Sequence, residues 1–230
     1  MEILNVIGNF FIEGGFFMYP VLFVAALGTA IVIERMLYIT RASANADSLW
    51  QKVRSALSDQ RIDDAIKLCQ SSTRPIYRVL SAGLRAAKPS GAREPIQRSM
   101  EETMLEVLPP LEQRTAYLPI LANVATLLGL LGTIIGVIEA FSAVSAADPS
   151  QKAVLLARGI SVALNMTAFG LMVAVPLILF YAFLQSRTTK IIDSLDQYST
   201  KLVNFFANRQ PTGVTLERSQ GHVAAVPKTS

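Results

Sequence analysis

Three long stretches of the chain are apolar and almost free of charge, and polar segments separate them. The apolar stretches are residues 16–33, 119–144 and 159–186, and Glu139 is the one charged residue within them. Each stretch has at least eighteen residues, and a helix of about that length can cross a hydrocarbon core roughly 30 Å thick. The pattern predicts an all-α integral membrane protein with three transmembrane helices.

The polar segment 34–118 repeats its apolar residues with the period of amphipathic helices. We expect a helical hairpin over residues 49–69, a third helix from Pro75, and a fourth from about Pro95. Pro109-Pro110 should interrupt or kink the fourth helix before it continues into the second span. The segment is therefore predicted to be a helical cytoplasmic domain.

The remaining segments are shorter and differ in character. Residues 1–15 form an N-terminal periplasmic segment, and residues 145–158 form a short periplasmic connection with the turn signal Asp148-Pro149-Ser150. Residues 187–208 continue the helical period of the third span and predict a long extension into the cytoplasm. Residues 209–230 contain Gly, Pro and Ser without a period, which predicts a disordered tail.

Small or hydroxylated residues follow one face of the second span and one face of the third, at helical spacing. Such faces let two helices approach closely in lipid, and their hydroxyls can bond across the contact. The two spans are therefore predicted to pack against each other. The face of the second span is Thr126, Gly129, Thr133, Gly136 and Ala140, and that of the third is Gly159, Ala163, Thr167, Gly170 and Ala174.

Composition narrows the class of protein further. The chain is 51% hydrophobic and 17% charged, with a mean hydropathy of +0.40, which is too apolar for an ordinary soluble domain. A single cysteine, Cys69, excludes an internal disulfide, and its apolar helix face predicts a buried structural thiol. A single histidine, His222, excludes a metal site built from several histidines of one chain. No cofactor is expected.

The basic residues indicate membrane orientation. The chain carries 21 Lys and Arg residues and a net charge of +4, but no basic run interleaved with aromatic residues, so nucleic acid is not an expected partner. Segments 34–118 and 187–230 hold 19 of these 21 cations. Since cytoplasmic loops carry the excess of Lys and Arg, we expect the C-terminus in the cytoplasm and the N-terminus on the opposite side of the membrane.

Two segments together resemble the signature helices of the MotA/TolQ/ExbB proton-channel family. They read LLGLLGTIIGVIEAF (127–141) and GISVALNMTAFGLMVAVP (159–176). Three spans and a large loop after the first are similar to the ExbB/TolQ branch. The resemblance implies a homopentamer whose second and third spans line a pore. It also implies a dimer of single-span ExbD/TolR/MotB-like subunits inside that pore, and ion flow, with H⁺ favoured over Na⁺, that drives movement.

The resemblance assigns Thr133 and Thr167 to the pore-facing threonines of the family, where they would bond water or the partner's carboxylate. Thr126 shares the face of Thr133 and is expected to line the pore as well. Many relatives carry a glutamate five residues before the second threonine, and here that position is Val162. Glu139 has two possible roles. It could stand at the pore entrance, or it could have a structural role at the interface, reaching headgroups or water or bonding to Ser142 or Ser161.

Three classes of function follow from these patterns. The favoured one is the pore-forming ring subunit of an energy-transducing complex driven by the ion motive force. The alternative is a passive membrane scaffold whose cytoplasmic helices recruit a partner. A membrane enzyme is not expected, because the sequence shows no nucleophile–base pair, metal-ligand cluster or phosphate-binding glycine loop. The sequence does not decide which process the complex powers: outer-membrane import, envelope maintenance, swimming or gliding.

Overall fold

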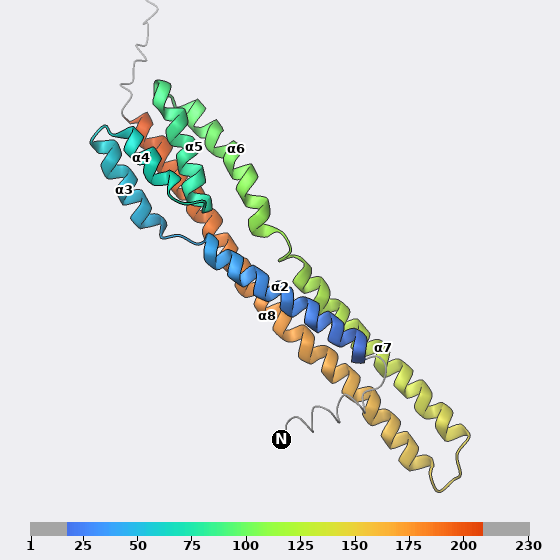
Figure 1. The fold of residues 1–230 in the computed structure, drawn as a ribbon. Coiled ribbons are helices and arrows are strands. Elements are labelled where there is room, and N and C mark those ends of the chain that lie inside the picture. The colour runs from blue at the N-terminus through green and yellow to red at the C-terminus, as the bar shows by residue number, and fades with distance from the viewer. Residues whose placement is uncertain (1–17, 209–230) are drawn as a thin grey trace, which may run out of the picture.

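The computed structural model describes residues 18–208, which fold into helices without strands (Figure 1). The predictions for residues 1–15 and 209–230, and the position of His222, lie outside the described residues. The helices are α2 (Met18–Ala42), α3 (Ala46–Ser58), α4 (Ile62–Gln70), α5 (Pro75–Ser90), α6 (Arg93–Glu112), α7 (Tyr117–Ser145) and α8 (Lys152–Ala207). The all-α prediction is confirmed.

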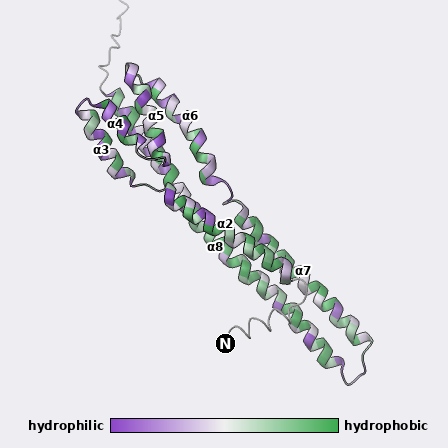
Figure 2. Cartoon of the chain, viewed as in Figure 1, coloured by the Kyte–Doolittle hydropathy of each residue, from purple (hydrophilic) through white to green (hydrophobic). Residues whose placement is uncertain are grey.

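Three parts of the chain are long and apolar enough to cross a membrane, as predicted. They lie in the segments Met18–Ser58, Arg93–Ser145 and Lys152–Ala207. Figure 2 shows the apolar residues concentrated along α2, α7 and the adjoining part of α8, whereas α3 to α6 are mixed. Many large apolar side chains on α2, α7 and α8 are exposed, which fits contact with lipid or with other subunits.

The molecule is elongated, with α7 and α8 forming a long antiparallel hairpin (Figure 1). α2 lies against both of these helices over the middle of the hairpin. The three helices share an apolar core that includes Val24, Ala125, Ala174 and Leu177. The hairpin loop between α7 and α8 is residues 146–151, so part of the predicted 145–158 connection belongs to the first turns of α8.

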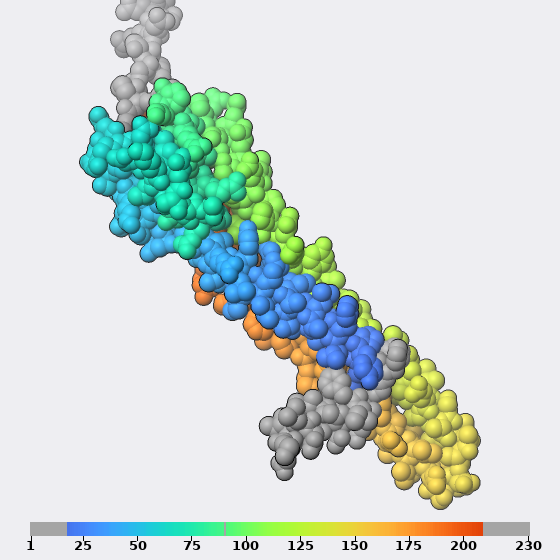
Figure 3. All heavy atoms as spheres, viewed as in Figure 1, coloured from blue at the N-terminus to red at the C-terminus, as the bar shows by residue number. Residues whose placement is uncertain are grey.

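A helical domain, made of α3 to α6 and the C-terminal part of α8, occupies the other end of the molecule (Figures 1 and 3). The predicted hairpin is present as α3 and α4. Its buried residues Leu49, Val53, Ala65 and Cys69 recur at helical spacing and face the shared core. Local signals set the ends of these helices. The Asn45 side chain accepts from the Ser48 N–H at the start of α3.

α8 supplies one wall of this domain, because its apolar stripe continues beyond the membrane-spanning part. Leu195, Tyr198 and Leu202 pack in the same core as Met100 and Leu111 of α6. The two helices run in opposite directions, so α6 and the extension of α8 pack in an antiparallel arrangement. Burial and a hydrogen bond to Asp47 of α3 raise the pKa of Tyr198 to about 12.

The break between α6 and α7 falls later than the prolines suggest. Pro109 and Pro110 lie inside the last turn of α6, and the helix ends only after Glu112. The backbone then turns at Gln113, with ψ 148°, and at Arg114, with φ 65°. The predicted interruption is present, but residues 113–116 make it, because the lost proline N–H groups weaken the turn without stopping it.

Candidate functional site

The small-residue faces of the second and third spans lie against each other in the structure. A β-carbon added at Gly170 would lie 2.7 Å from the carbonyl oxygen of Ala125 and 3.1 Å from Cα of Gly129. One added at Gly136 would lie 3.0 Å from Cβ of Ala163. These distances leave no room for larger side chains, so the backbones of α7 and α8 approach as closely as small residues allow.

The same contact extends towards the hairpin loop. A β-carbon added at Gly159, near the start of α8, would collide with Ala140 of α7. Ala163 and Ala140 are buried at this contact. The five residues expected to pack the helices therefore lie between α7 and α8: Gly129, Gly136, Gly159, Ala163 and Gly170.

Thr133 of α7 and Thr167 of α8 meet in the middle of this contact, where their hydroxyl groups are hydrogen-bonded to each other. Thr133 Oγ1 also lies 3.1 Å from the carbonyl oxygen of Gly129 and 3.2 Å from that of Ala163. Thr167 Oγ1 lies 3.2 Å from the same Gly129 oxygen. Two side chains that are 34 residues apart in sequence thus form one polar cluster between two apolar helices.

The cluster has more acceptors than protons. Each hydroxyl group carries one proton and two lone pairs, so the pair holds two protons. One proton bridges the two hydroxyl oxygens, and the other is donated to a carbonyl oxygen. In one arrangement Thr133 donates to Thr167, and Thr167 donates to the Gly129 carbonyl oxygen. In the other arrangement Thr167 donates to Thr133, and Thr133 donates to the carbonyl oxygen of Ala163 or Gly129.

Both threonine side chains are half-buried, so part of the cluster is accessible on the surface of this single chain. Their unused lone pairs can accept a hydrogen bond from a further group that approaches there. In the opposite orientation, one of the hydroxyls can donate to that group instead. The arrangement can therefore serve both a donor and an acceptor, such as water or a carboxyl group that gains and loses a proton.

The other predicted pore residues are placed differently. Thr126 is half-buried, and its hydroxyl donates to the Ala122 carbonyl oxygen of its own helix at 3.1 Å. Glu139 is exposed, six residues beyond Thr133, which corresponds to about 9 Å along the helix axis. Within residues 18–208 the structure shows no hydrogen bond from Glu139 to Ser142 or Ser161.

Arg35 is a buried charged residue, which the hydropathy and charge patterns of the sequence did not single out. Its side chain is 5% exposed, and its Nη1 donates to the carbonyl oxygen of Pro110 at 2.9 Å. The break after α6 leaves that carbonyl without a helical partner, so the guanidinium group caps the C-terminus of α6. The buried positions of α2 include Gly28, Val32, Arg35 and Ile39, so helical period could have revealed that Arg35 faces inward.

Glu34 completes this second cluster at the α6–α7 break. Its carboxylate pairs with Arg35 Nη2 at 2.9 Å and with Arg114 Nη1 at 3.2 Å. Arg114 is the residue with positive φ in the break. The end of α2 thus holds both sides of the junction between the helical domain and the second span.

Among residues 18–208, no group of three or more His, Cys, Asp or Glu side chains could hold a metal ion.

Comparison with known proteins matches residues 71–197 to the model of the MotA/TolQ/ExbB proton channel family. The matched range contains α7, most of α8 and both threonines. The chain belongs to this family. A similar relative is the putative biopolymer transport protein ExbB-like 1 of Synechocystis, 31% identical over 80% of this chain and 72% of the relative. The Tol-Pal system protein TolQ of Haemophilus influenzae is 29% identical over 75% and 81% of the two chains.

A shorter match is closer in sequence. The biopolymer transport protein exbB1 of Vibrio cholerae is 46% identical over 59 residues, which is 26% of each chain. Membership of the MotA/TolQ/ExbB family, together with three apolar helices, makes this chain a membrane protein of a proton-channel family that works in energy-transducing complexes. The resemblance inferred from the sequence is confirmed.

Proposed function

We propose that this chain is the pore-forming ring subunit of a complex in the bacterial inner membrane that is powered by the proton motive force. Five copies would surround a central pore lined by α7 and α8, and a dimer of single-span ExbD/TolR/MotB-like subunits would occupy it. The observation that carries the proposal is the hydrogen-bonded pair Thr133–Thr167, a polar cluster in the middle of two otherwise apolar helices. Family membership and the names of the relatives support the same assignment.

The role of the hydroxyl pair follows from the cost of placing a charge in an apolar pore. A lone carboxylate there loses several kcal/mol of solvation. Donation from Thr133 or Thr167 offsets part of that loss while the partner's carboxyl group is ionised. When the carboxyl group is protonated, the bond chain reverses and a threonine oxygen accepts from it, so both states have a hydrogen-bond partner.

Two features of this chain should make the hydroxyl pair more important here than in relatives that keep the glutamate. Position 162, where many relatives carry glutamate, is a half-buried valine. Glu139 is exposed near the end of α7 that adjoins the hairpin loop, where we place the periplasmic water. Within residues 18–208, therefore, no acid of this subunit lies at the depth of the threonines. The proton carried at that depth would belong to the partner's carboxyl group, with H⁺ favoured over Na⁺ as the ion.

The proposed orientation puts the helical domain in the cytoplasm and the α7–α8 loop in the periplasm. The distribution of cations supports it, since α3 to α6 and the end of α8 hold most of them. A periplasmic N-terminus follows from the same count. The arrangement is that of an ion channel and energy transducer; no catalytic activity is proposed.

The test uses the chain co-purified with its single-span partner and reconstituted into liposomes, with proton entry followed by an internal pH-sensitive dye under an imposed potential. We expect Thr133→Val and Thr167→Val each to abolish proton entry while ring assembly and partner binding persist, because valine keeps the shape and removes the hydroxyl. Thr133→Ser should retain activity. Thr29→Val is the matched control, since within the described part of the chain the Thr29 hydroxyl bonds only to the Ala25 carbonyl of its own helix, at 2.7 Å.

Glu139→Gln should be milder than either valine substitution, because its carboxylate is exposed to the proposed outer water. Full proton entry in the double variant Thr133→Val, Thr167→Val would refute the hydroxyl mechanism. If the wild-type chain instead bound its partner and admitted no protons, the passive scaffold would become the better description. Monomers alone in a native mass spectrum taken under mild conditions would contradict the ring.

A further inference from the structure

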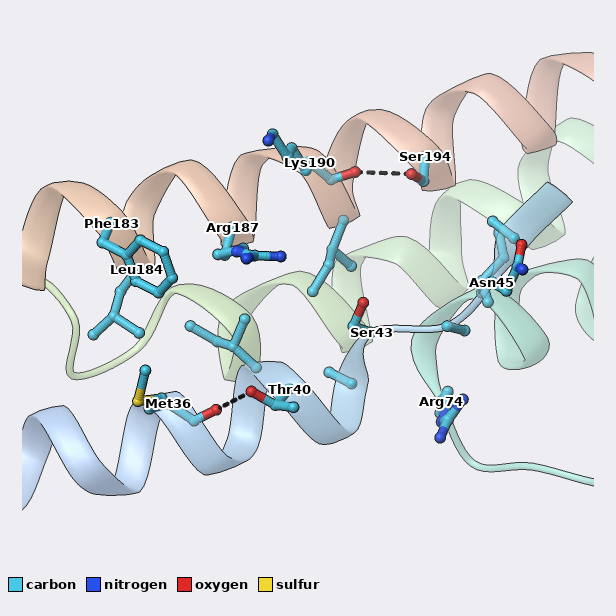
Figure 4. Close-up of a pocket in the computed structure, with 16 residues that line it drawn as sticks. Met36, Thr40, Ser43, Asn45, Arg74, Phe183, Leu184, Arg187, Lys190 and Ser194 are labelled. Atoms are coloured by element: carbon cyan, nitrogen blue, oxygen red, sulfur yellow. Dashed lines mark hydrogen bonds between the residues drawn. The ribbon is translucent and has the colours of Figure 1, made fainter.

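A cavity of about 660 Å³ opens between the C-terminal end of α2, the connection into α3, and α8 (Figure 4). Met36 and Ile39 contribute one apolar wall, and Phe183 and Leu184 contribute the other. The cavity lies where two predicted spans end. Arg187 is the first charged residue after the third span, and Met36 follows the first span by one turn. It therefore sits at the level of the lipid headgroups on the side of the helical domain.

The charged side chains that line this cavity are all positive. Its lining includes the cations Arg74, Arg187 and Lys190 and no Asp or Glu. None of the three cations forms an ion pair with an acid within residues 18–208. Cations gathered at one depth of a membrane protein attract anions strongly when no acid pairs with them, as is the case here among residues 18–208.

The polar groups are arranged around an apolar floor. The guanidinium carbon of Arg187 lies 5.2 Å from the centre of the Phe183 ring, so this cation is held over an aromatic face. Figure 4 shows the hydroxyl group of Ser43 directed towards α8 and Arg74 at the far end of the cavity, beside the connection into α3. Donors of this kind suit phosphate oxygens, which accept several hydrogen bonds at once.

The apolar walls continue into the surface that faces the bilayer. Met36 and Phe183 are each 44% exposed, and Phe180, one turn nearer the membrane centre, is 42% exposed. A soluble anion would leave this surface uncovered. A molecule with a charged head and hydrocarbon chains covers both parts, with the head among the cations and the chains along α2 and α8.

We infer that this cavity binds the headgroup of an anionic phospholipid from the leaflet on the side of the helical domain, which is the cytoplasmic leaflet in the proposed orientation. The phosphate lies near Arg187 and Ser43, and Arg74 and Lys190 add to the positive potential. A zwitterionic lipid binds less well, because its ammonium group meets the same three cations. The bound lipid ties α2 to α8 and to the start of the helical domain.

The test is native mass spectrometry of the full-length protein, purified and delipidated in detergent, with phosphatidylglycerol or phosphatidylcholine added in increasing amounts. The double variant Arg74→Gln, Arg187→Gln is compared with the control Arg54→Gln, Arg158→Gln, which loses the same charge at exposed positions outside the cavity. A basic residue near an anionic lipid surface contributes a factor of about five to binding, so the cavity variant should bind phosphatidylglycerol roughly 30-fold more weakly.

The control should bind phosphatidylglycerol as the wild type does, and phosphatidylcholine should bind weakly to all three proteins. Equal loss in the cavity variant and the control, or equal binding of the two lipids, would overturn the inference. Displacement of the lipid by soluble glycerol phosphate at the same concentration would assign the site to a soluble anion instead. Failure of the wild type to bind more phosphatidylglycerol than the cavity variant would overturn the inference as well.

The double substitution could also impair folding. In that case the single variant Arg74→Gln carries the test, because the Arg74 side chain is exposed and its loss leaves the packing intact. A roughly fivefold weakening of phosphatidylglycerol binding is then expected. Unchanged phosphatidylglycerol binding in Arg74→Gln, or a loss of the same size in the Arg54→Gln, Arg158→Gln control, would refute the site.

Discussion

Substitution of Gly170 by alanine should separate α7 from α8 at the centre of their contact. The added β-carbon would lie 2.7 Å from the Ala125 carbonyl oxygen, and 3.1 Å from Cα of Gly129. Both obstacles are backbone atoms, so no side chain can turn away to make room. To restore an ordinary contact, the two helices must move apart by about 0.7 Å, which forfeits a quarter to a half of each van der Waals attraction nearby.

The size of the effect can be worked out from two opposing contributions. Overpacking a tight contact costs about 1–3 kcal/mol, and a backbone obstacle belongs in the upper part of that range. Alanine recovers about 1 kcal/mol relative to glycine inside a helix. The net destabilisation is therefore about 1–2 kcal/mol, which for a chain of this size lowers the thermal midpoint by roughly 4 °C. Proton entry should fall as well, because Gly129 accepts from Thr167 at this contact.

Gly132→Ala is the matched control, in the same helix pair. Its added β-carbon would meet Met166, with Sδ at 2.5 Å and Cβ at 3.1 Å, and these atoms belong to one flexible side chain. We expect its midpoint to stay within about 2 °C of the wild type, since the thioether can move aside. The measurement is the temperature at which half of the purified assembly disappears from size-exclusion chromatography. A Gly170→Ala protein as stable as wild type would refute the reasoning from backbone contact.

Three further predictions concern the helical domain and its junction with the membrane. The double variant Leu195→Asp, Leu202→Asp should dissociate or destabilise the assembly, because both side chains are at most 1% exposed and burying a charge there is costly. Elution like the wild type in size-exclusion chromatography would contradict this. The Cys69 thiol has its pKa raised to about 12 by burial, so alkylation at pH 8 should be slow until the protein unfolds, and fast labelling of the native protein would show the thiol is accessible. Arg35→Met should lower the free energy of unfolding by about 1–3 kcal/mol, because the Pro110 carbonyl loses a charged donor; thermal melting that matches the wild type would exclude the cap.

Much of the architecture was predictable from local pattern. The three apolar stretches, the hairpin of α3 and α4, and the inward positions of α8 all follow from hydrophobicity repeated at fixed spacing. The meeting of α7 and α8 was also predictable, because small residues at helical spacing can bury themselves only against another close helix. The positions of Thr133 and Thr167 on those faces follow from the same spacing.

Other features depend on residues that are far apart in the chain. The α6–α7 break lies after the prolines. The Pro110 carbonyl at this break accepts a hydrogen bond from Arg35 of α2, which is 75 residues away in the sequence. The cavity at the headgroup level combines Met36, Arg74 and Arg187 from three separate segments. Helical period shows which side of a helix faces inward, but not which partner lies there. Crossing angles and connections decide that, so the hydroxyl pair, the Arg35 cap and the lipid cavity exist only in the tertiary structure.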